Sequence, residues 1–514
     1  MKNNVIQRAT GYAGLAVDLR KAKRSTDDTV RANARSHLSE RMGKLRGLPQ
    51  KIGQIMSMSD DELTGNPFSN LTDGATPLPL TEIVPVLEAA WGTPIDTILS
   101  DLTPDAAAAS LGQVHRARLL DGREVAVKVA YPGIRKAVES DLKMLGWLSA
   151  PVGDLRRGFD LGAYRREIVR DLNEELDYRI EFEHQQAFAR IATSLTGLIV
   201  PEPIESLCCE QVIVSIWEDG DRAEDVCHWP EKHRARLARR MLDHFLTMLF
   251  DHGLVHADPH PGNYRFRLDP TNGPEVVLYD YGSVTKLSTQ DRLLLLRLLT
   301  DTVALQGDPL AVLASLGFNA DLLEPIAAKL PAVCRVLFEP FQSPTKFDTK
   351  AWHRTERLND ILAADRWNFR MAGPAKLFLL MRAFRGILYY LDRFEAPVSW
   401  NRSLAPLIAR HGALTKAVAV PAPQVTSTTF APMAKHLRVE VYRGSCRAVS
   451  LTMPIGAIED LQQVIDEEII QRIAERGVSL AELVRDSRRS GYAPGELFKL
   501  DIPEDNKTIR VWTE

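Results

Sequence analysis

The chain has 514 residues, 45% of them hydrophobic and 25% charged, which is an ordinary composition for a soluble globular protein. Its length allows about three domains. The net charge of −3 gives no overall attraction to nucleic acid, and the basic stretches are not interleaved with aromatic residues, so no nucleic-acid partner is expected. Five cysteines without a Cys-x-x-Cys pair favour a reducing compartment. Because the chain has no signal core and no apolar run of about 18 residues, we expect a cytoplasmic protein that does not span a membrane.

The N-terminal segment is basic. Residues 1–51 contain twelve Lys or Arg against four Asp or Glu. This bias is typical of a solvated helix face, and peripheral contact with an anionic membrane surface is the alternative. Lys51 and Gln54 stand three apart, which places them on one face of a helix. Four prolines between 67 and 85 indicate a linker, and we predict an N-terminal helical extension over residues 1–100.

A strand, an Asp-Gly turn and a second strand are predicted next, ending at Val129. Val-Ala-Val-Lys128 has the pattern of the kinase strand whose lysine contacts the α- and β-phosphates of a nucleotide. The preceding loop is rich in alanine where a kinase has glycines. Alanine resists positive φ, so this loop should approach the phosphates differently. The loop residues expected at the nucleotide are Ala107, Ala108, Ala109 and Ser110.

A charged helical region is predicted between residues 161 and 191. If the kinase interpretation holds, an acid in this region must pair with Lys128. Glu174, Asp177 and Glu181 have i, i+3, i+7 spacing and would share one helix face. Spacing alone therefore leaves the partner of Lys128 open.

Residues 211–220 have the pattern of the last small-lobe strand running into a hinge. The backbone of such a hinge would bind adenine, with Trp217 and Glu218 nearest to it. We place a kinase-like N-lobe with a helical insertion over residues 101–220, and a kinase-like C-lobe over residues 221–415.

The polar stretch 254–263 has the Asp-to-Asn spacing of a kinase catalytic loop, between Asp258 and Asn263. Two short strands with a turn between them would bring Asn263 and Asp280 to the same end of a ribbon. In kinase chemistry the first Asp orients or deprotonates the attacking group, while the Asn and the second Asp hold Mg²⁺ against the nucleotide phosphates. One alternative is an unspecialised Pro/Gly loop. Another is a transition-metal cluster, or a metallohydrolase site, at His256, Asp258 and His260.

The interval after Asp280 is short. Residues 283–288 leave no room for a segment that would dock a peptide, and no Ala-Pro-Glu follows. Helical patterns continue to about His411. The apolar stretch 367–394 is interpreted as core helices, with an amphipathic membrane contact as the alternative.

The last part of the chain is predicted to be a separate small unit. Residues 416–434 are rich in Pro, Ser and Thr and indicate a linker. Residues 435–514 have the pattern of a hairpin, a helix from about 458 to 476 and a closing strand at 507–512. This order is compatible with a ubiquitin-like β-grasp and contains no catalytic constellation.

Together these motifs resemble the UbiB/ADCK (AarF-type) atypical kinase-like family over residues 1 to about 410. The motifs that carry the resemblance are Lys51-Ile-Gly-Gln54, the alanine-rich 107–115, Glu175-Leu-Asp177 and His256-Ala-Asp-Pro-His-Pro-Gly-Asn263. Bacterial members often end in transmembrane helices, whereas this chain ends in the small α/β unit. Tyr281 replaces the usual Phe, which packing should tolerate.

The resemblance implies roles that spacing does not give. In the family the Lys-x-Gly-Gln segment packs over the active site, which would put Lys51 and Gln54 against Glu175 and Asp177. The family's helix glutamate falls on Glu181, as the partner of Lys128. The family is associated with ATP hydrolysis or small-molecule phosphorylation and with ubiquinone biosynthesis at membranes.

The expected fold class is therefore α+β, a bilobal kinase-like fold with a helical extension and a small C-terminal unit. The first functional hypothesis is an ATP- and Mg²⁺-dependent phosphotransferase or ATPase acting on a small or lipid-like metabolite. The second is a nucleotide-binding pseudokinase scaffold that recruits a protein partner through residues 435–514. Retention of Lys128, Asp258, Asn263 and Asp280 favours the first.

Overall fold

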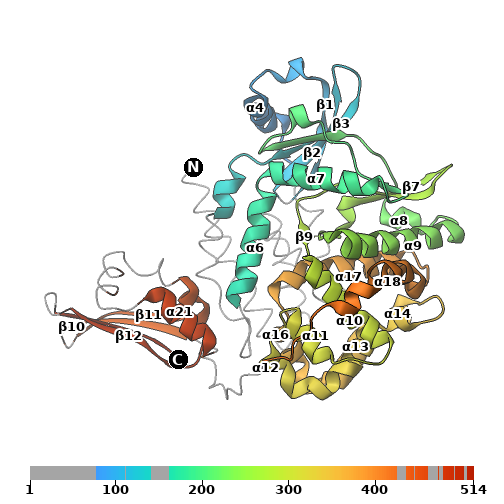
Figure 1. Cartoon of the computed structure of the whole chain (residues 1–514). Helices are drawn as coiled ribbons and strands as arrows, with labels where there is room; N and C mark the ends of the chain where they lie inside the picture. The colour runs from blue at the N-terminus through green and yellow to red at the C-terminus, as the bar shows by residue number, and fades with distance from the viewer. Residues whose placement is uncertain are drawn as a thin grey trace, which may run out of the picture.

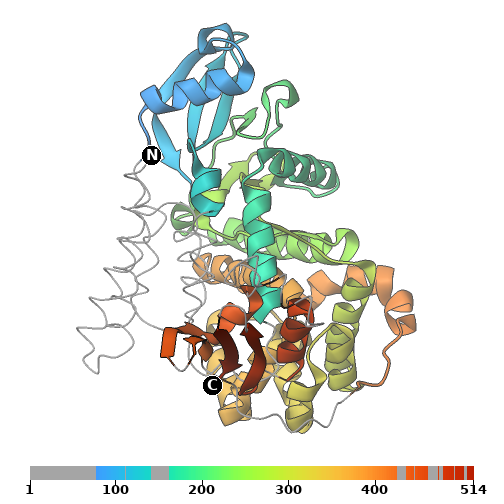
Figure 2. The same ribbon diagram turned by 90° about the vertical axis from the view of Figure 1, so that its left-hand side faces the viewer.

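The computed structural model describes residues 77–109, 111–139 and 161–424, and in the C-terminal part 434, 436–444, 446–460, 470, 473, 479–490, 492–502 and 506–514. Figures 1 and 2 show a small upper lobe of strands, a larger helical lobe below it, and a separate C-terminal sheet. Helix α7 (Tyr178–Ala192) lies between the two lobes, and α6 (Leu161–Glu175) runs from its level down the side of the large lobe. This arrangement agrees with the two-lobed expectation.

The small lobe is built on one antiparallel sheet in the order β1-β2-β3-β5. Its strands are β1 (Leu99–Ala108), β2 (Gly112–Leu119), β3 (Glu124–Ala130) and β5 (Val212–Ile216). Strand β3 alternates, with Val125, Val127 and Val129 fully buried in the lobe core. Since side chains alternate along a strand, Lys128 lies on the opposite face of β3 from these valines.

The prediction of a linker between residues 67 and 85 was wrong for residues 80–85, which belong to a helix. Helix α4 (Leu80–Trp91) begins directly after Pro79 and contains Pro85 within it. Ile83 and Leu87 are one turn apart, are fully buried and pack on the sheet core. This burial outweighs the backbone hydrogen bond lost at Pro85, so tertiary packing overrides the proline signal.

The charged region forms two helices instead of one. Helix α6 (Leu161–Glu175) ends before Asp177, which caps α7 (Tyr178–Ala192) by accepting a hydrogen bond from the backbone N–H of Arg179. Glu174 and Glu181 are consequently on different helices that run in different directions (Figure 1). The expectation that Glu174, Asp177 and Glu181 share one helix face was therefore wrong.

The large lobe combines short strands with many helices. Its strands are β4 (Leu198–Ile199), β6 (Leu254–His256), β7 (Tyr264–Asp269), β8 (Gly273–Leu278) and β9 (Val284–Lys286). Its main helices are α8 (Ala223–Val226), α9 (Glu231–Thr247), α10 (Thr289–Val303), α11 (Pro309–Ser315), α12 (Ala320–Leu323), α13 (Leu330–Leu337), α14 (Glu339–Gln342), α15 (Arg354–Leu362), α16 (Arg366–Ala372), α17 (Phe378–Arg393) and α18 (Trp400–Ala417). A five-residue π-helical turn, Met248–His252, joins α9 to Gly253 and β6.

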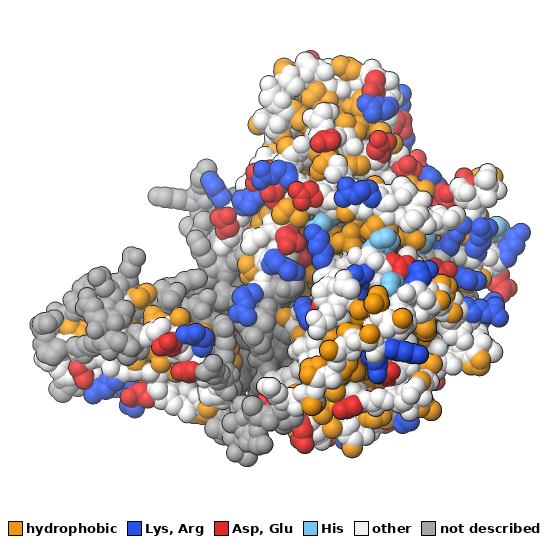
Figure 3. Space-filling model, in the orientation of Figure 1, with side chains coloured by type: hydrophobic (Ala, Val, Ile, Leu, Met, Phe, Trp, Pro, Cys, Tyr) orange, Lys and Arg blue, Asp and Glu red, His pale blue; other side chains and the backbone are white. Residues whose placement is uncertain are grey.

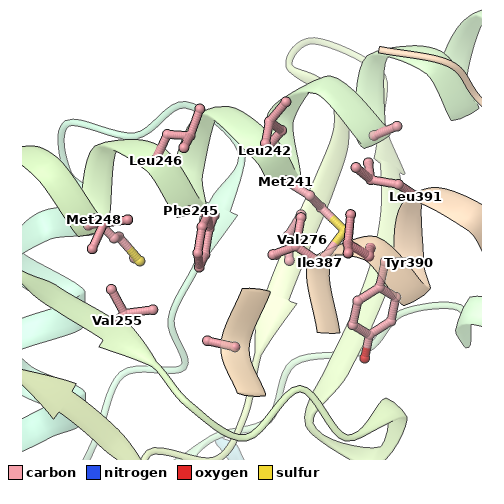
Figure 4. Packing of buried hydrophobic residues seen from close by; sticks show 14 of the residues in the cluster. Met241, Leu242, Phe245, Leu246, Met248, Val255, Val276, Ile387, Tyr390 and Leu391 are labelled. Atoms are coloured by element: carbon pink, nitrogen blue, oxygen red, sulfur yellow. The ribbon is translucent and has the colours of Figure 1, made fainter. Parts of the chain in front are cut away.

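The large-lobe core is centred on α9 and α17. Figure 4 shows Met241 and Phe245 of α9 on the side of the helix that faces Val276 and the α17 residues Ile387 and Tyr390. The buried positions of α17 support the interpretation of 367–394 as core. Among the residues that the structure describes, no helix is long and apolar enough to cross a bilayer.

The C-terminal unit is an antiparallel sheet in the order β11-β10-β13-β12. Its elements are β10 (His436–Arg443), β11 (Cys446–Pro454), α21 (Leu480–Arg489), β12 (Gly495–Ile502) and β13 (Lys507–Thr513). The α/β character agrees with expectation, but the ubiquitin-like topology does not, because β10 and β13 pair antiparallel where a β-grasp pairs its first and last strands parallel. Strand β12 was not predicted, and its hairpin with β13 reverses the direction of the last strand. The predicted helix 458–476 lies largely outside the described residues.

The buried His244 makes stability depend on pH. Its Nε2 lies 3.1 Å from the Thr196 carbonyl oxygen, and burial lowers its pKa to about 4. A histidine with a lowered pKa stabilises the fold fully above its unfolded pKa of about 6.5 and loses this contribution as pH falls toward 4. Between those limits we expect wild type to lose roughly 3 kcal/mol more unfolding free energy than His244→Gln.

Denaturant unfolding at pH 7, 5.5 and 4 measures this difference. His228→Gln, an exposed control, should follow wild type. If His244→Gln lost stability in parallel with wild type, the buried imidazole would not be the group that titrates.

Candidate active site

The centre of the candidate site is one lysine between two carboxylates. The Nζ of Lys128 lies 2.6 and 2.8 Å from the two Glu181 carboxylate oxygens and 2.7 Å from Oδ2 of Asp280. The ring of Tyr178 packs beside the same ammonium, 5.1 Å from its centroid. The pairing that the resemblance implied, Lys128 with Glu181, is therefore present.

The three groups perturb each other's ionisation. Burial disfavours the charged lysine, but the carboxylates of Asp280 and Glu181 hold the pKa of Lys128 well above its usual value. Burial also raises the pKa of Glu181. At Asp280 burial is outweighed by the ammonium, which lowers the pKa. With Lys128 charged and both acids ionised, one positive and two negative charges leave a net charge of −1, which favours a cation at the open side of Asp280.

Local structure explains why Glu181 and Asp280 meet. Asp177 caps α7, so Glu181 follows one turn later on the first part of the helix. The backbone N–H of Tyr281 donates to a Glu181 oxygen at 3.3 Å, and Nδ1 of His184, also on α7, lies 3.1 Å from the Tyr281 carbonyl. Helix α7 is thus fastened to the segment that carries Asp280.

The two acidic residues of the Glu-x-Asp motif, Glu175 and Asp177, make different contacts. Glu175 is buried, with its Cγ 3.3 Å from where a Cβ on Gly282 would lie, so it borders the Asp280 segment. Asp177 instead holds the guanidinium of Arg179 at 2.7 Å and caps α7. The predicted partners Lys51 and Gln54 lie outside the described residues, as does Ser110, and the roles of all three stay predictions.

The hairpin of β7 and β8 brings the other two polar residues together. Tyr264 pairs with Leu278 in its register, so Asn263 and Asp280 lie at the same end of the hairpin. The Nδ2 of Asn263 donates to the Asp258 carbonyl oxygen at 3.3 Å. The Asn263 amide oxygen and the Asp280 carboxylate are the hard donors that Mg²⁺ takes from proteins, so this pair could hold the ion.

The transition-metal alternative does not fit the geometry. The Nδ1 of His256 lies 3.0 Å from the Tyr264 hydroxyl, and its Nε2 contacts the Asp280 carbonyl. Nδ1 of His260 accepts from the Gly262 N–H at 3.0 Å. Within the described ranges no group of three His, Cys, Asp or Glu side chains could hold a metal.

The alanine-rich segment is an extended strand that ends in a tight turn. Ala107 and Ala108 pair with Val114 and Gln113 as the end of β1, and the Ala109 N–H donates to the Gly112 carbonyl at 2.8 Å. None of the three alanines has a positive φ. The structure agrees with the expectation that this segment lacks the freedom of a glycine loop.

The predicted hinge residues Trp217 and Glu218 form hydrogen bonds within the protein. The Trp217 N–H donates to the Glu124 carbonyl at 2.9 Å, and the Glu218 carbonyl accepts from the Tyr279 hydroxyl at 2.5 Å. The Glu218 carboxylate pairs with Arg267 at 2.7 Å. A carbonyl has a second lone pair, so Glu218 can still meet a ligand donor, and its adenine role stays a prediction.

One face of α17, which the sequence patterns did not indicate, supports the loop that carries Asp258. The buried Arg382 donates to the Asp258 carboxylate. One turn later, a Cβ on Gly386 would collide with Pro259, and after another turn the Tyr390 hydroxyl donates to the Pro259 carbonyl at 3.1 Å. The signal in the sequence was an arginine, a glycine and a tyrosine at i, i+4, i+8 within an apolar helix.

Arg382 supplies a cation that the loop itself lacks. No Lys or Arg occurs between Asp258 and Asn263. The Nε and Nη1 of Arg382 are buried and have no hydrogen-bond partner among the residues that the structure describes. Buried guanidinium donors without partners cost free energy, so burial of this residue serves the position of Asp258 more than stability.

The comparisons with known proteins agree with this geometry. The family model for the ABC1 atypical kinase-like domain matches residues 70–313. The chain contains an ABC1 atypical kinase-like domain. The UbiB/ADCK resemblance and the kinase-like fold are thereby confirmed.

Curated relatives share the domain over parts of their length. AarF domain-containing protein kinase 1 of Xenopus laevis is 32% identical over 48% of this chain and 49% of its own length. Mitochondrial atypical kinase COQ8B of Rattus norvegicus is 26% identical over 74% of this chain and 72% of its own. The chain thus spans about half the length of the first of these relatives. The solved complex of Rv3197 with erythromycin from Mycobacterium tuberculosis is 24% identical over 79% of this chain and 98% of that chain, with a TM-score of 0.49.

Arg382→Gln should impair catalysis far more than nucleotide binding. Without its cation Asp258 loses its fixed position, and displacement of about 1 Å of a catalytic group can cost on the order of a hundredfold in rate. We expect turnover of ATP to fall at least tenfold, with the Mg·ATP dissociation constant within about threefold of wild type. The turnover rate of Arg382→Lys should lie between those of wild type and Arg382→Gln.

Arg393→Gln, an exposed arginine on the same helix, is the matched control. Steady-state ADP production and calorimetric binding are measured on all four proteins. Full turnover by Arg382→Gln would show that the contact with Asp258 has no part in the reaction.

Proposed function

We propose that this chain is an ATP-dependent phosphotransferase or ATPase that acts on a small or lipid-like metabolite and supports ubiquinone or isoprenoid-lipid biosynthesis. The observation that carries the proposal is the bridge from Lys128 to Glu181 and Asp280, beside a loop in which Arg382 holds Asp258. A scaffold without catalysis would not require Arg382 to be buried against Asp258.

The roles of the residues follow from their positions. Lys128 would move from Asp280 to the nucleotide phosphates while staying paired with Glu181. Asn263 and Asp280 would hold Mg²⁺, which neutralises charge developing on the phosphates. Asp258 would orient the attacking hydroxyl or water and accept its proton, with Arg382 fixing the direction of the carboxylate.

The acceptor is proposed to be a small molecule because the region after Asp280 leaves little room for a peptide. Strand β9 begins at Val284 and pairs with β6, and α10 begins at Thr289. The Ser288 hydroxyl caps α10 by accepting from the Asp291 N–H at 3.0 Å. The interval from Val284 to Thr289 is therefore occupied by a strand and a helix cap, and it contains no loop long enough to dock a peptide.

Mg·ATP should stabilise the chain. At a hundredfold excess over the dissociation constant the gain is roughly 3 kcal/mol. Wild type should therefore melt at higher temperature with saturating Mg·ATP, and Asp280→Asn should lose most of this shift because the metal loses its anionic donor. Asp269→Asn, on the outer turn of β7 and β8, is the matched control. An unchanged melting temperature for nucleotide-free wild type would contradict nucleotide binding at this site.

Ala109→Gly should change how the nucleotide is held. Glycine permits positive φ at the turn that Ala109 closes with Gly112, so backbone N–H groups could approach the phosphates more closely. We expect an altered ratio of ATP to ADP affinity or increased autophosphorylation. Calorimetry with both nucleotides and radiolabelled phosphate transfer test this expectation. Identical values for wild type and Ala109→Gly would mean that the alanine turn is ordinary packing.

Metabolite and lipid profiling tests the proposed function as a whole. A deletion strain and an Asp258→Asn strain should accumulate the same unphosphorylated or unprocessed compound. If Asp258→Asn restored the deletion completely, the pseudokinase scaffold, with a partner at residues 435–514, would be the better account. Stoichiometric transfer of γ-phosphate to a defined protein would contradict a small-molecule acceptor.

A further inference from the structure

A groove of about 570 Å³ runs along the C-terminal half of α7, outside the nucleotide site. Its other wall is formed by the turn before β6 and by the end of β9. The volume is within the range of small-molecule sites, roughly 300 to 1,000 Å³. Figure 3 shows, between α7 and the lower lobe, a belt where apolar side chains lie beside basic and histidine side chains.

The floor of the groove is apolar and firmly placed. Leu254 is 9% exposed, and Ile191 and Leu287 pack on the large-lobe core. Gly253 has a φ of +67°, and a Cβ there would lie 2.6 Å from the Leu287 carbonyl oxygen. Only a glycine allows this close approach, so the floor has one well-defined shape.

The rim of the groove is basic. Arg190 from α7 and Lys286 from β9 are both exposed, and within the part of the chain that the structure describes neither side chain makes an ion pair. His252 adds an imidazole. The nearest acids along the chain are Glu183, exposed on α7, Asp251, which is held by Arg410 and His411 at 2.6 Å each, and Asp291, which is paired with Lys376 at 2.6 Å.

The two walls of the groove belong to elements that build the active site. Helix α7 carries Glu181, the partner of Lys128. Lys286 pairs with Leu254 in the β6–β9 ribbon, which leads into the catalytic loop. Burial is the main cause that lowers the pKa of His184 on α7, and the positive charge of Lys286 lowers it further. Lys286 on one wall is therefore close enough to α7, the other wall, for the two to interact electrostatically.

We propose that this groove binds an amphiphilic phosphate, with the phosphate between Arg190 and Lys286 and a short apolar tail over Ile191, Leu254 and Leu287. Two cations that form no ion pair with the described residues attract a dianionic head, and the apolar floor distinguishes such a ligand from free phosphate. The ligand draws α7 toward the β6–β9 ribbon. It thereby stabilises the pair of Lys128 with Glu181 and changes the affinity for Mg·ATP, a regulation that rests on the proposed function.

Calorimetric titration of the full chain with monohexyl phosphate tests the site. Wild type should bind it at least about tenfold more tightly than inorganic phosphate, because each buried methylene strengthens binding by roughly fourfold. Hexanol should bind at least tenfold more weakly. The double variant Arg190→Gln/Lys286→Gln should lose at least tenfold in affinity, whereas Lys232→Gln/Arg236→Gln, two exposed cations of α9, should match wild type.

Three outcomes would overturn the proposal. The first is equal binding of monohexyl phosphate by the groove variant and wild type. The second is equal affinity of wild type for inorganic phosphate and monohexyl phosphate. The third is binding only to phosphatidylcholine vesicles containing anionic phosphatidylglycerol, which would indicate a membrane surface and not a pocket.

Mg·ATP affinity is then measured with and without saturating monohexyl phosphate. At least a threefold change in wild type, absent in Arg190→Gln/Lys286→Gln, is expected. An unchanged affinity despite binding in the groove would contradict the regulation of α7. If Mg·ATP failed to bind under any condition, the proposed function would be contradicted. The titration with monohexyl phosphate would still test ligand binding in the groove independently.

Discussion

The structure depends on one ammonium that two carboxylates share. Lys128 comes from the small-lobe sheet, Glu181 from α7 and Asp280 from the large lobe, so a single side chain joins three elements. Two carboxylates this close would repel each other strongly without the cation between them. We propose that a nucleotide with its metal releases Asp280 from Lys128 while the pair with Glu181 stays in place. Nucleotide binding and the alignment of the lobes would then be coupled through one residue.

A second electrostatic interaction, between Asp258 and Arg382, lies in the large lobe. Asp258 lies in a loop without a nearby cation in sequence, and α17 provides Arg382 from more than a hundred positions away. Gly386 and Tyr390 on the same helix face fix Pro259, the next residue of the loop. The position of the Asp258 carboxylate, the proposed catalytic group, is thus set by packing against α17. A helix whose apolar face forms the core also carries the loop that would react.

Local patterns predicted what depends on nearby residues. The strand with Lys128, the hairpin joining Asn263 to Asp280 and the short segment before α10 each follow from alternation, turn residues or spacing. The pairing with Glu181 required the family resemblance, because Glu174 and Asp177 offered the same charge at helical spacing. The break between α6 and α7 decides among them, and it depends on a cap at Asp177 that competes with a continuous helix.

Features that depend on distant contacts were missed or misjudged. The helix containing Pro85 forms because Ile83 and Leu87 are buried on a sheet that the sequence does not place beside them. Strand β12 was missed, and without it the direction of β13 could not be inferred. The support of Asp258 by Arg382 joins segments whose proximity no local rule reveals. These are cases in which tertiary packing decides the structure.

The role of Asp258 is tested by measuring ADP release from wild type and Asp258→Asn, each at saturating Mg·ATP. We expect both proteins to bind the nucleotide with similar affinity and only wild type to release ADP at a measurable rate. Equal rates from the two proteins would contradict the assignment of Asp258 as the group that orients the attacking hydroxyl or water, and with it the proposal that this site performs phosphoryl transfer.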